Sequence, residues 1–385
     1  MFARLPGWEK YAILKHKFQR FDGRHEKEAG QAVNEHIAVA MSGGVDSSAA
    51  AWLLKEQGHR LTGVTLTLQG EREESEDVRD AREVAKLLDF PHRVLDLSQV
   101  FCAQVMDRFV ASYEAGETPN PCVDCNRRIK FGALLEHVRD MGCDALATGH
   151  YARTEYDAGS GRWLLKKALH PEKDQSYVLC TLTQAQLAAS RFPLGGLSKP
   201  EIRAIAQEHG LVNARKKDSQ DICFVPDGDY AAFIRRHSGR DYPPGDFLDM
   251  EGRVLGRHEG IIGYTIGQRR GLGVSSNQGR LYVQQVRPED NTVILGDNAS
   301  LFSTALTARD LNLIAVERLS RPTRMWAKVR YRQQEQPCVV EQTDENTILV
   351  TFDQPQRAVT PGQAVVLYDG DTVVGGATIQ HRKDG

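Results

Sequence analysis

The 385-residue sequence has no long apolar run, no large excess of either charge and few cysteines. No stretch approaches the roughly 18 apolar residues that a membrane-spanning helix needs, and the first 30 residues contain no continuous apolar segment of the secretory type. Seven cysteines, an odd number in a long chain, argue against a disulfide framework. We therefore expect a monomeric cytoplasmic protein that does not bind a membrane. Because the formal net charge is only −2, any nucleic-acid site must be a local basic patch.

Strand and helix patterns alternate in the first half of the chain. Apolar strand patterns occupy 36–41, 60–68, 93–97 and 144–151. Helical patterns between them begin near Ser47, Val78 and Asn126. This alternation predicts an α/β fold with a parallel, Rossmann-like sheet covered by helices.

The pattern changes after Pro226, where Gly and short strands become frequent, and again near residue 302, after which it is all strand. At 385 residues the chain is long enough for two or three domains. We expect an N-terminal extension at 1–35, an α/β domain at 36–226, a small central domain at 227–301 and a β-barrel at 302–385.

The stretch "AVAMSGGVDSSAAAWLL" places a Ser-Gly-Gly loop between a strand and a helix. Gly43 and Gly44 permit close backbone approach, the serines supply hydroxyl groups, and the helix N-terminus attracts anions. The loop lacks the lysine of a Walker A motif. A glycine turn before a helix can be purely structural, but this combination favours an anion-binding loop.

The stretch "TPNPCVDCNRRIKFGALLEHV" contains a Cys-x-x-Cys pair. Its apolar residues predict a helix that begins near Asn126 and places Cys125 at the helix N-terminus. That position, together with Arg127, Arg128 and Lys130, should favour the thiolate form of Cys125. Half of a zinc knuckle is the alternative, although the sequence has no second Cys-x-x-Cys pair.

Cys223 lies between Ile222 and Phe224 in "ARKKDSQDICFVPDGDY", so by itself it could be a buried strand cysteine.

The stretch "RMWAKVRYRQ" has an alternating pattern of apolar and basic residues. Strict alternation there predicts a strand from Arg324 to Arg332 whose even-numbered face carries basic side chains and Trp326. A solvated strand face and a phosphate-binding stripe are both consistent with this pattern. Further basic clusters lie at 127–130, 215–217 and 269–270 and suit contacts to a phosphate backbone.

SGGVDSS resembles the pyrophosphate-binding loop of the ATP pyrophosphatases, which cleave ATP to AMP and pyrophosphate. Taken in order with "NPCVDCNRRIKFG", "ATGHYAR", "KDQSYVL", "DSQDICFV", "GYTIGQRRGLGV" and "VRYRQ", it resembles the bacterial tRNA-specific 2-thiouridylases over most of the chain from residue 36. The resemblance implies that the wobble uridine of tRNA is adenylated on its carbon-2 oxygen and then receives sulfur to give 2-thiouridine. It also implies ATP with Mg²⁺, and a sulfur-relay protein or cysteine desulfurase as the donor.

The resemblance assigns roles to individual residues. Cys125 would be the nucleophile and Cys223 the persulfide carrier. The ATP-binding residues would be Ala40, Met41, Ser42, Gly43, Gly44, Val45, Asp46, Ser47, Leu66 and Gly149. Those bordering the target base would be Asn120, Pro121 and Cys122. Those touching tRNA would be His150, Lys173, Asp174, Gln175, Arg330, Tyr331 and Gln363.

Cys122 departs from the family pattern, in which many members carry Asp at this position. A third thiol beside Cys125 and Cys223 could complete the ligands of a 4Fe-4S cluster, so persulfide and cluster mechanisms both stay open. Two other function classes remain. One is a small-molecule adenylating synthetase of the ATP pyrophosphatase family, and the other is a non-catalytic RNA-binding protein. The cysteine pair argues against both.

Overall fold

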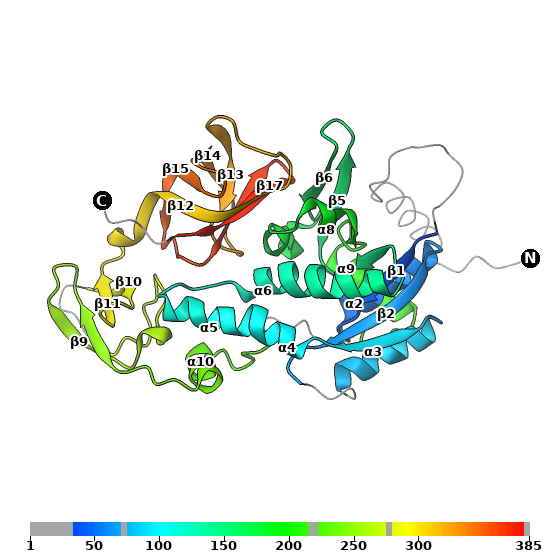
Figure 1. Ribbon diagram of the computed structural model, residues 1–385, viewed down its shortest axis with the longest axis horizontal. Coiled ribbons are helices and arrows are strands. Elements are labelled where there is room, and N and C mark those ends of the chain that lie inside the picture. The colour runs from blue at the N-terminus through cyan, green and yellow to red at the C-terminus, as the bar shows by residue number, and fades with distance from the viewer. Residues whose placement is uncertain (1–33, 71–74, 215, 217–221, 275–278, 381–385) are drawn as a thin grey trace, which may run out of the picture.

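The computed structural model describes residues 34–70, 75–214, 216, 222–274 and 279–380 (Figure 1). Residues 1–33 of the expected extension therefore lie outside the described residues. Within the described part, the chain forms a parallel sheet with helices, a small mixed sheet and a larger antiparallel sheet, in sequence order. No helix in the described ranges is long and apolar enough to cross a membrane.

The described part of the first domain contains a five-stranded sheet in the order β3-β2-β1-β4-β7, and all of its pairings are parallel. Its strands are β1 (His36–Ala40), β2 (Arg60–Thr67), β3 (His92–Asp96), β4 (Ala145–Ala147) and β7 (Ser190–Arg191). The strand expected at 144–151 is thus shorter than its pattern suggested. Because the order reverses at β1, the carboxyl ends of β1 and β4 border the crevice where such sheets bind ligands.

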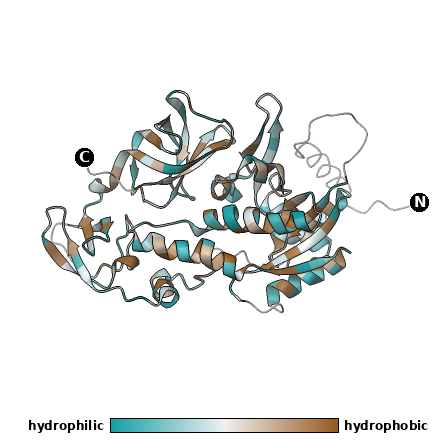
Figure 2. Ribbon diagram, in the orientation of Figure 1, coloured by the Kyte–Doolittle hydropathy of each residue, from teal (hydrophilic) through white to brown (hydrophobic). Residues whose placement is uncertain are grey.

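Helices cover both faces of this sheet, as the alternation predicted (Figures 1 and 2). Ile37 and Val39 pack in one apolar core with residues of α2 and α9, whereas Ala38 packs in the other core with residues of α5 and α7. The helices of the domain are α2 (Val45–Glu56), α3 (Glu76–Leu87), α4 (Ser98–Phe101), α5 (Asp107–Glu114), α6 (Pro121–Asp124), α7 (Leu134–Asp140), α8 (Gln184–Ala188) and α9 (Lys199–Glu208). Short 3-10 turns lie at η3 (Pro171–Lys173) and η4 (Ser176–Leu179).

Two helical segments depart from the sequence-based expectation. The helix expected from Asn126 begins at Pro121, because the Asn120 side chain accepts a hydrogen bond from the Cys122 N–H and caps the helix there. It continues to Asp140 through the π-helix η2 (Cys125–Ala133). A second π-helix, η1 (Cys102–Met106), joins α4 to α5. Likewise α2 begins at Val45 rather than at Ser47.

The central region follows α10 (Tyr230–Ser238). Its described strands form a mixed sheet in the order β10-β11-β8-β9. They are β8 (Gly245–Leu248), β9 (Val254–His258), β10 (Tyr282–Arg287) and β11 (Thr292–Gly296), accompanied by the 3-10 turns η5 (Ile261–Gly263) and η6 (Ala299–Leu301).

The C-terminal strands close into an antiparallel barrel in the order β12-β15-β14-β13-β16-β17, and β12 pairs with β17. They are β12 (Phe302–Leu313), β13 (Thr323–Lys328), β14 (Gln336–Gln342), β15 (Ile348–Arg357), β16 (Ala364–Asp369) and β17 (Thr372–Ile379). The sheet also extends back into the first domain, because β17 pairs with β6 (Arg162–Lys167) of a hairpin that includes β5 (Ala152–Asp157). This hairpin holds the barrel beside the parallel sheet.

Candidate active site and family

The Ser-Gly-Gly loop leaves the carboxyl end of β1 and leads into α2. Gly43 has a φ of +67°, and a Cβ at this position would lie 2.5 Å from the Asp77 Cα, so the loop needs glycine here. Helices α3, α6, α8, α9 and α10 each begin with a side chain that caps the first turn. The N-cap of α2 is Gly44, which provides no side-chain cap. The first turn of α2 is therefore suited to an anion.

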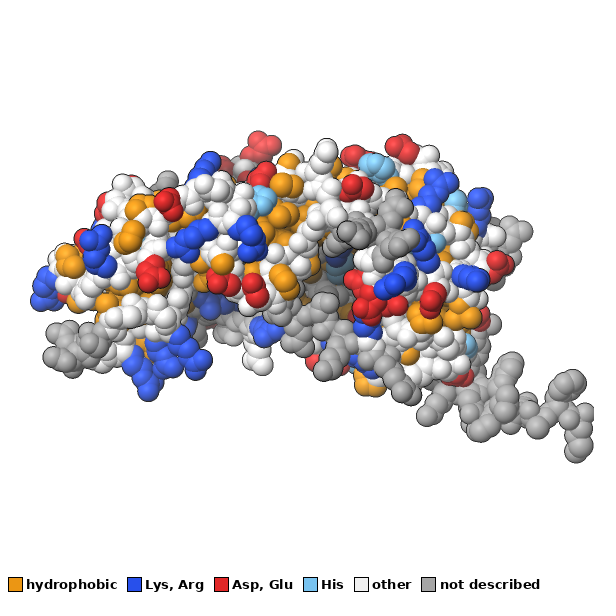
Figure 3. Space-filling model, turned by 90° about the horizontal axis from the view of Figure 1, so that it is seen from below, with side chains coloured by type: hydrophobic (Ala, Val, Ile, Leu, Met, Phe, Trp, Pro, Cys, Tyr) orange, Lys and Arg blue, Asp and Glu red, His pale blue; other side chains and the backbone are white. Residues whose placement is uncertain are grey.

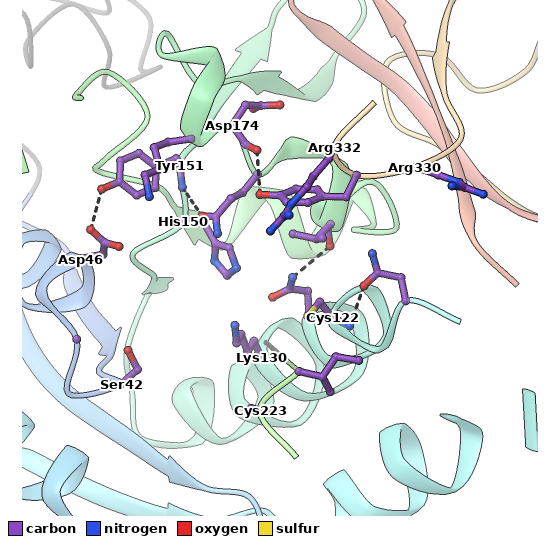
Figure 4. Close-up of a pocket in the computed structure, with 18 of the residues that line it drawn as sticks. Ser42, Asp46, Cys122, Lys130, His150, Tyr151, Asp174, Cys223, Arg330 and Arg332 are labelled. Carbon is purple, nitrogen blue, oxygen red and sulfur yellow. Dashed lines mark hydrogen bonds between the residues drawn. The ribbon is translucent and has the colours of Figure 1, made fainter. Parts of the chain in front are cut away.

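Asp46, in the first turn of α2, is held by two residues from elsewhere in the chain. Lys199 donates hydrogen bonds of 2.8 Å to both carboxylate oxygens. The Tyr151 hydroxyl donates one of 2.7 Å to Oδ1 (Figure 4). Lys199 lies at the start of α9, after the Ser198 cap. It brings a cation to a loop that has no lysine of its own.

Gly149 lies against this loop. A Cβ at Gly149 would lie 2.9 Å from both the Asp46 carbonyl carbon and the Ser47 nitrogen. Any larger residue would push the start of α2 away from the end of β4. Glycine is therefore required at two positions: at Gly43 within the loop and at Gly149, which packs against the loop.

The three thiols named from the sequence gather at the N-terminus of the helix that begins with α6. Cys122 and Cys223 are exposed and Cys125 is half-buried, and the structure describes all three as free thiols. Cys122 lies in the first turn, so this residue occupies the helix N-terminus expected for Cys125. The carbonyl of Cys223 accepts a 3.2 Å hydrogen bond from the Gln69 side chain.

The prediction that the helix N-terminus and nearby cations favour the Cys125 thiolate is wrong for this structure. Burial raises the pKa of Cys125 to about 11, and the opposing effect of Lys130 is smaller. Negative charge on Cys122 or Cys223 also raises the pKa of Cys125. Cys122 and Cys223 reach solvent through the cavity, but desolvation by the surrounding cavity walls also raises their pKa values. Lys130 is a cation that lowers the pKa of all three thiols.

One cavity of about 1860 Å³ joins the loop, the thiols and the barrel. Its lining includes most of the residues assigned from the resemblance. They are Ser42, Gly44, Val45, Asp46, Leu66, Asn120, Cys122, His150, Lys173, Asp174, Gln175, Cys223, Arg330, Tyr331 and Gln363. The remaining assigned residues are not part of this lining: Ala40, Met41, Gly43, Ser47, Pro121, Cys125 and Gly149. Figure 4 shows Asp46, Lys130, Cys122 and Cys223 around the same space.

Several residues assigned to tRNA hold the cavity wall together. The Asp174 carboxylate accepts hydrogen bonds from Ala168 and Ser176. Gln363 donates a 2.7 Å hydrogen bond to the Thr118 carbonyl and so ties the barrel to the segment before α6. His150 is buried, its Nδ1 lies 2.8 Å from the Thr148 hydroxyl, and burial holds its pKa well below the usual value. This imidazole is neutral at pH 7.

The basic strand differs from its prediction in length and in charge pairing. β13 ends at Lys328. The buried face continues one residue further to Val329, but Tyr331, expected on the same face, is exposed. Arg324 forms an ion pair with Asp353 and does not line the cavity. Arg330 donates hydrogen bonds to the Ala358 carbonyl and the Thr360 hydroxyl.

Trp326 and Arg332 remain exposed on the cavity side of this segment. The Trp326 side chain is 48% exposed, although it lines the cavity together with Arg332. Figure 4 shows Arg332 extending over the helix that carries Cys122, while Arg330 lies toward the barrel. A large flat ring and a guanidinium group at one cavity wall suit contacts with a nucleic acid.

Two of the other predicted basic clusters are partly engaged within the protein. Lys216 lines the cavity but donates hydrogen bonds of 2.7 Å to Asp77 and to Asp80. Arg215 and Lys217 lie outside the described residues. Arg128 pairs with Asp124 in the next turn of the helix.

Sequence reasoning missed Lys199 and Tyr151. No motif marked Lys199, because its partner Asp46 lies 153 residues away in the chain. Tyr151 stood inside the quoted motif "ATGHYAR" without a role. Lys130 was noted only as part of a basic cluster.

Comparisons with known proteins agree with this arrangement. Residues 35–227 match the family model described as the tRNA methyl transferase HUP domain. Residues 231–297 match a tRNA methyl transferase PRC-barrel domain, and residues 303–379 match an aminomethyltransferase beta-barrel domain.

Two bacterial relatives are similar over nearly their whole length. A tRNA-specific 2-thiouridylase MnmA 1 from Caldanaerobacter subterraneus subsp. tengcongensis is 47% identical over 91% of this chain and 99% of its own length. A tRNA-specific 2-thiouridylase MnmA from Clostridioides difficile is 45% identical over 90% of this chain and 99% of its own length. With this identity over this coverage, the chain belongs to the family of tRNA-specific 2-thiouridylases.

Proposed function

We propose that this protein is a tRNA 2-thiouridylase, an ATP-dependent sulfurtransferase that converts the wobble uridine of tRNA to 2-thiouridine. The observation that carries the proposal is one shared cavity. It is lined by the start of α2, by Cys122 and Cys223, and by Trp326 and Arg332 of the barrel. An anion-binding loop, a sulfur carrier and a nucleic-acid surface are the three parts that the reaction needs.

The first step is activation of the uridine. Its carbon-2 oxygen attacks the α-phosphorus of ATP, pyrophosphate leaves, and the base carries an AMP group on that oxygen. The first turn of α2 has no side-chain cap and would hold the β- and γ-phosphates. Lys199, already placed at Asp46, would turn one of its N–H groups toward the negative charge that develops on pyrophosphate.

Asp46 also fits a Mg²⁺ ligand, because Mg²⁺ is commonly held by one or two carboxylates together with phosphates and water. Mg²⁺ would neutralise charge on the pyrophosphate. Since both Asp46 oxygens accept hydrogen bonds from Lys199 in this structure, the ammonium group would have to release at least one of them.

The second step is sulfur transfer. The terminal sulfur of a Cys223 persulfide attacks carbon 2, and AMP leaves. The Cys125 thiolate then attacks the Cys223 sulfur, which releases 2-thiouridine and forms a Cys125–Cys223 disulfide. An external dithiol must reduce this disulfide before the next turnover. A relay protein or cysteine desulfurase would load Cys223, whose exposure suits access by such a donor.

A second version of the sulfur step uses a 4Fe-4S cluster on Cys122, Cys125 and Cys223. Cys122 and Cys223 line the same cavity, and both raise the pKa of Cys125, which supports this version. Three thiolates fit a cluster with one open iron position. In this version Cys122, a bystander in the persulfide scheme, is essential.

The function is tested by incubating the protein with unmodified tRNA, ATP and a sulfide or persulfide source. Nucleosides are then analysed by mass spectrometry, and nucleotides by chromatography. We expect 2-thiouridine, AMP and pyrophosphate, all dependent on tRNA. Release of AMP without tRNA would support a small-molecule synthetase instead, and release of ADP and phosphate would contradict the proposal.

A further inference from the structure

A cluster of three metal-ligand side chains lies where α10 meets the helix that contains η1. The ligand atoms of Cys102, Asp107 and His237 all lie within 4.8 Å of one another, and within the described residues this is the only such group. The His237 Nε2 lies 2.7 Å from the Asp107 Oδ1. The Cys102 Sγ lies 3.8 Å from the same oxygen and 4.0 Å from the same nitrogen.

The π-helix creates this cluster. Cys102 and Asp107 are five residues apart, and in a regular α-helix residues at this spacing point in different directions. Because η1 spans Cys102–Met106, the wider turn brings both side chains to one face of the helix. His237, in the last turn of α10, faces them from the other element.

The geometry suits a cation better than a catalytic relay. In a Cys-His-Asp triad the cysteine and the carboxylate contact opposite ring nitrogens. Here both contact Nε2 of His237. A thiol, a carboxylate and an imidazole whose ligand atoms lie within 4.8 Å of one another match three of the four ligands of a zinc ion.

The distances support the same conclusion. Zinc bonds of about 2.0 to 2.3 Å in tetrahedral geometry place ligand atoms roughly 3.3 to 3.6 Å apart. The two distances from Cys102 are slightly longer than this, and the distance between His237 and Asp107 is shorter. The Asp107 side chain is 57% exposed, so its carboxylate has room to move outward by the roughly 0.6 to 0.9 Å that this geometry requires.

We propose that Cys102, Asp107 and His237 form a zinc site that clamps α10 to the first domain. Figure 3 shows acidic and basic side chains interspersed over the face of the molecule that is seen from below in Figure 1. No proposed step of thiolation uses these three residues.

The clamp would also steady the segment that carries Cys223. The Phe224 ring contacts the rings of Phe101, Phe109 and Phe233. Phe233 in turn stacks on His237, with ring centroids 5.3 Å apart. These aromatic contacts join the zinc site to the residue that follows Cys223.

The test uses the full-length chain with Cys122, Cys125 and Cys223 replaced by Ala, which removes the competing active-site thiols. Zinc binding is measured against a chromophoric chelator, and Co²⁺ is used as a spectroscopic probe of thiolate ligation. We expect one zinc per chain, a thiolate-to-cobalt absorption band and a thermal unfolding midpoint that rises with added zinc.

Cys102→Ala should remove the cobalt band, and His237→Gln should weaken zinc binding at least tenfold. His137→Gln is the matched control, because His137 is an exposed histidine on another helix, and it should bind zinc as the background does. Circular dichroism checks that each variant is folded, and Asp107→Asn replaces any that is not. A background chain that binds no zinc, or binds it equally well without Cys102 and His237, would overturn the proposal.

Discussion

The ammonium group of Lys199 lies 2.8 Å from each carboxylate oxygen of Asp46, across 153 residues of chain. This pair gives the Ser-Gly-Gly loop a cation that its own motif lacks. Since the Lys199 side chain is 11% exposed, solvent screens its charge only weakly. The first prediction follows from this contact.

Lys199→Ala should lower the rate of tRNA-dependent pyrophosphate release by about 10²- to 10³-fold, the range seen when one stabilising donor is removed from an active site. Binding of tRNA should change little, and Lys199→Arg should restore part of the rate. Lys55→Ala, which removes an exposed lysine at the far end of α2, is the control. Equal rates for Lys199→Ala and the control would show that pyrophosphate release does not depend on Lys199.

Gly149→Ala should impair ATP use. The added methyl group would meet the backbone of Asp46 and Ser47 at 2.9 Å, so it would displace the first turn of α2. We expect a rise of tenfold or more in KM for ATP, measured by pyrophosphate release. Gly263→Ala is the matched control, because no heavy atom lies within 4 Å of the new Cβ. An unchanged KM in Gly149→Ala would mean that the loop tolerates the shift.

Alkylation of Cys125 should depend steeply on pH. Burial raises the pKa of this thiol to about 11, so the neutral thiol dominates at pH 7 and the reactive thiolate increases about tenfold for each pH unit below that value. Peptide mapping after iodoacetamide treatment measures the rate. Lys130→Gln should slow the reaction at every pH below 10, because Lys130 lowers the pKa. A plateau below pH 8 would show that the thiolate is stabilised, contrary to this structure.

Arg332→Ala should weaken tRNA binding and flatten its salt dependence. If Arg332 contacts one phosphate, the slope of log affinity against log salt concentration should fall by about 0.7 to 0.9. Arg324→Ala is the matched control, because Arg324 is paired with Asp353 and lies outside the cavity. Binding measured by fluorescence anisotropy from 50 to 300 mM salt, roughly the range in which such slopes are resolved, would decide. Identical slopes for both variants would place the phosphates elsewhere.

Cys122→Ala distinguishes the two sulfur mechanisms. In the cluster version, anaerobically purified protein contains iron and sulfide, and Cys122→Ala loses both the cluster and thiolation. In the persulfide version the wild-type protein is iron-free and active, and Cys122→Ala keeps its full rate, while Cys125→Ala and Cys223→Ala abolish it. Iron and sulfide analysis, together with mass spectrometry of tRNA nucleosides, checks both.

Sequence patterns alone established the class of fold, and most of the residues assigned from the family resemblance line the cavity. Alternating strand and helix patterns were enough for the parallel sheet, because periodicity reports which side chains face a core. The ordered motifs around Ser42, Cys122 and Cys223 identified a family, and these motifs line one cavity in the structure. These motifs can be recognised in the sequence because each one groups functional residues that are close together in the chain.

The tertiary structure decided what depends on residues far apart in the chain. It placed Lys199 on Asp46, joined the hairpin of β5 and β6 to the barrel, and paired Arg324 with Asp353. It also reversed the expectation for Cys125, because burial by the surrounding fold raises the thiol pKa more than Lys130 lowers it. Desolvation and long-range pairing arise from the packing of the whole chain, so no local motif could have revealed them.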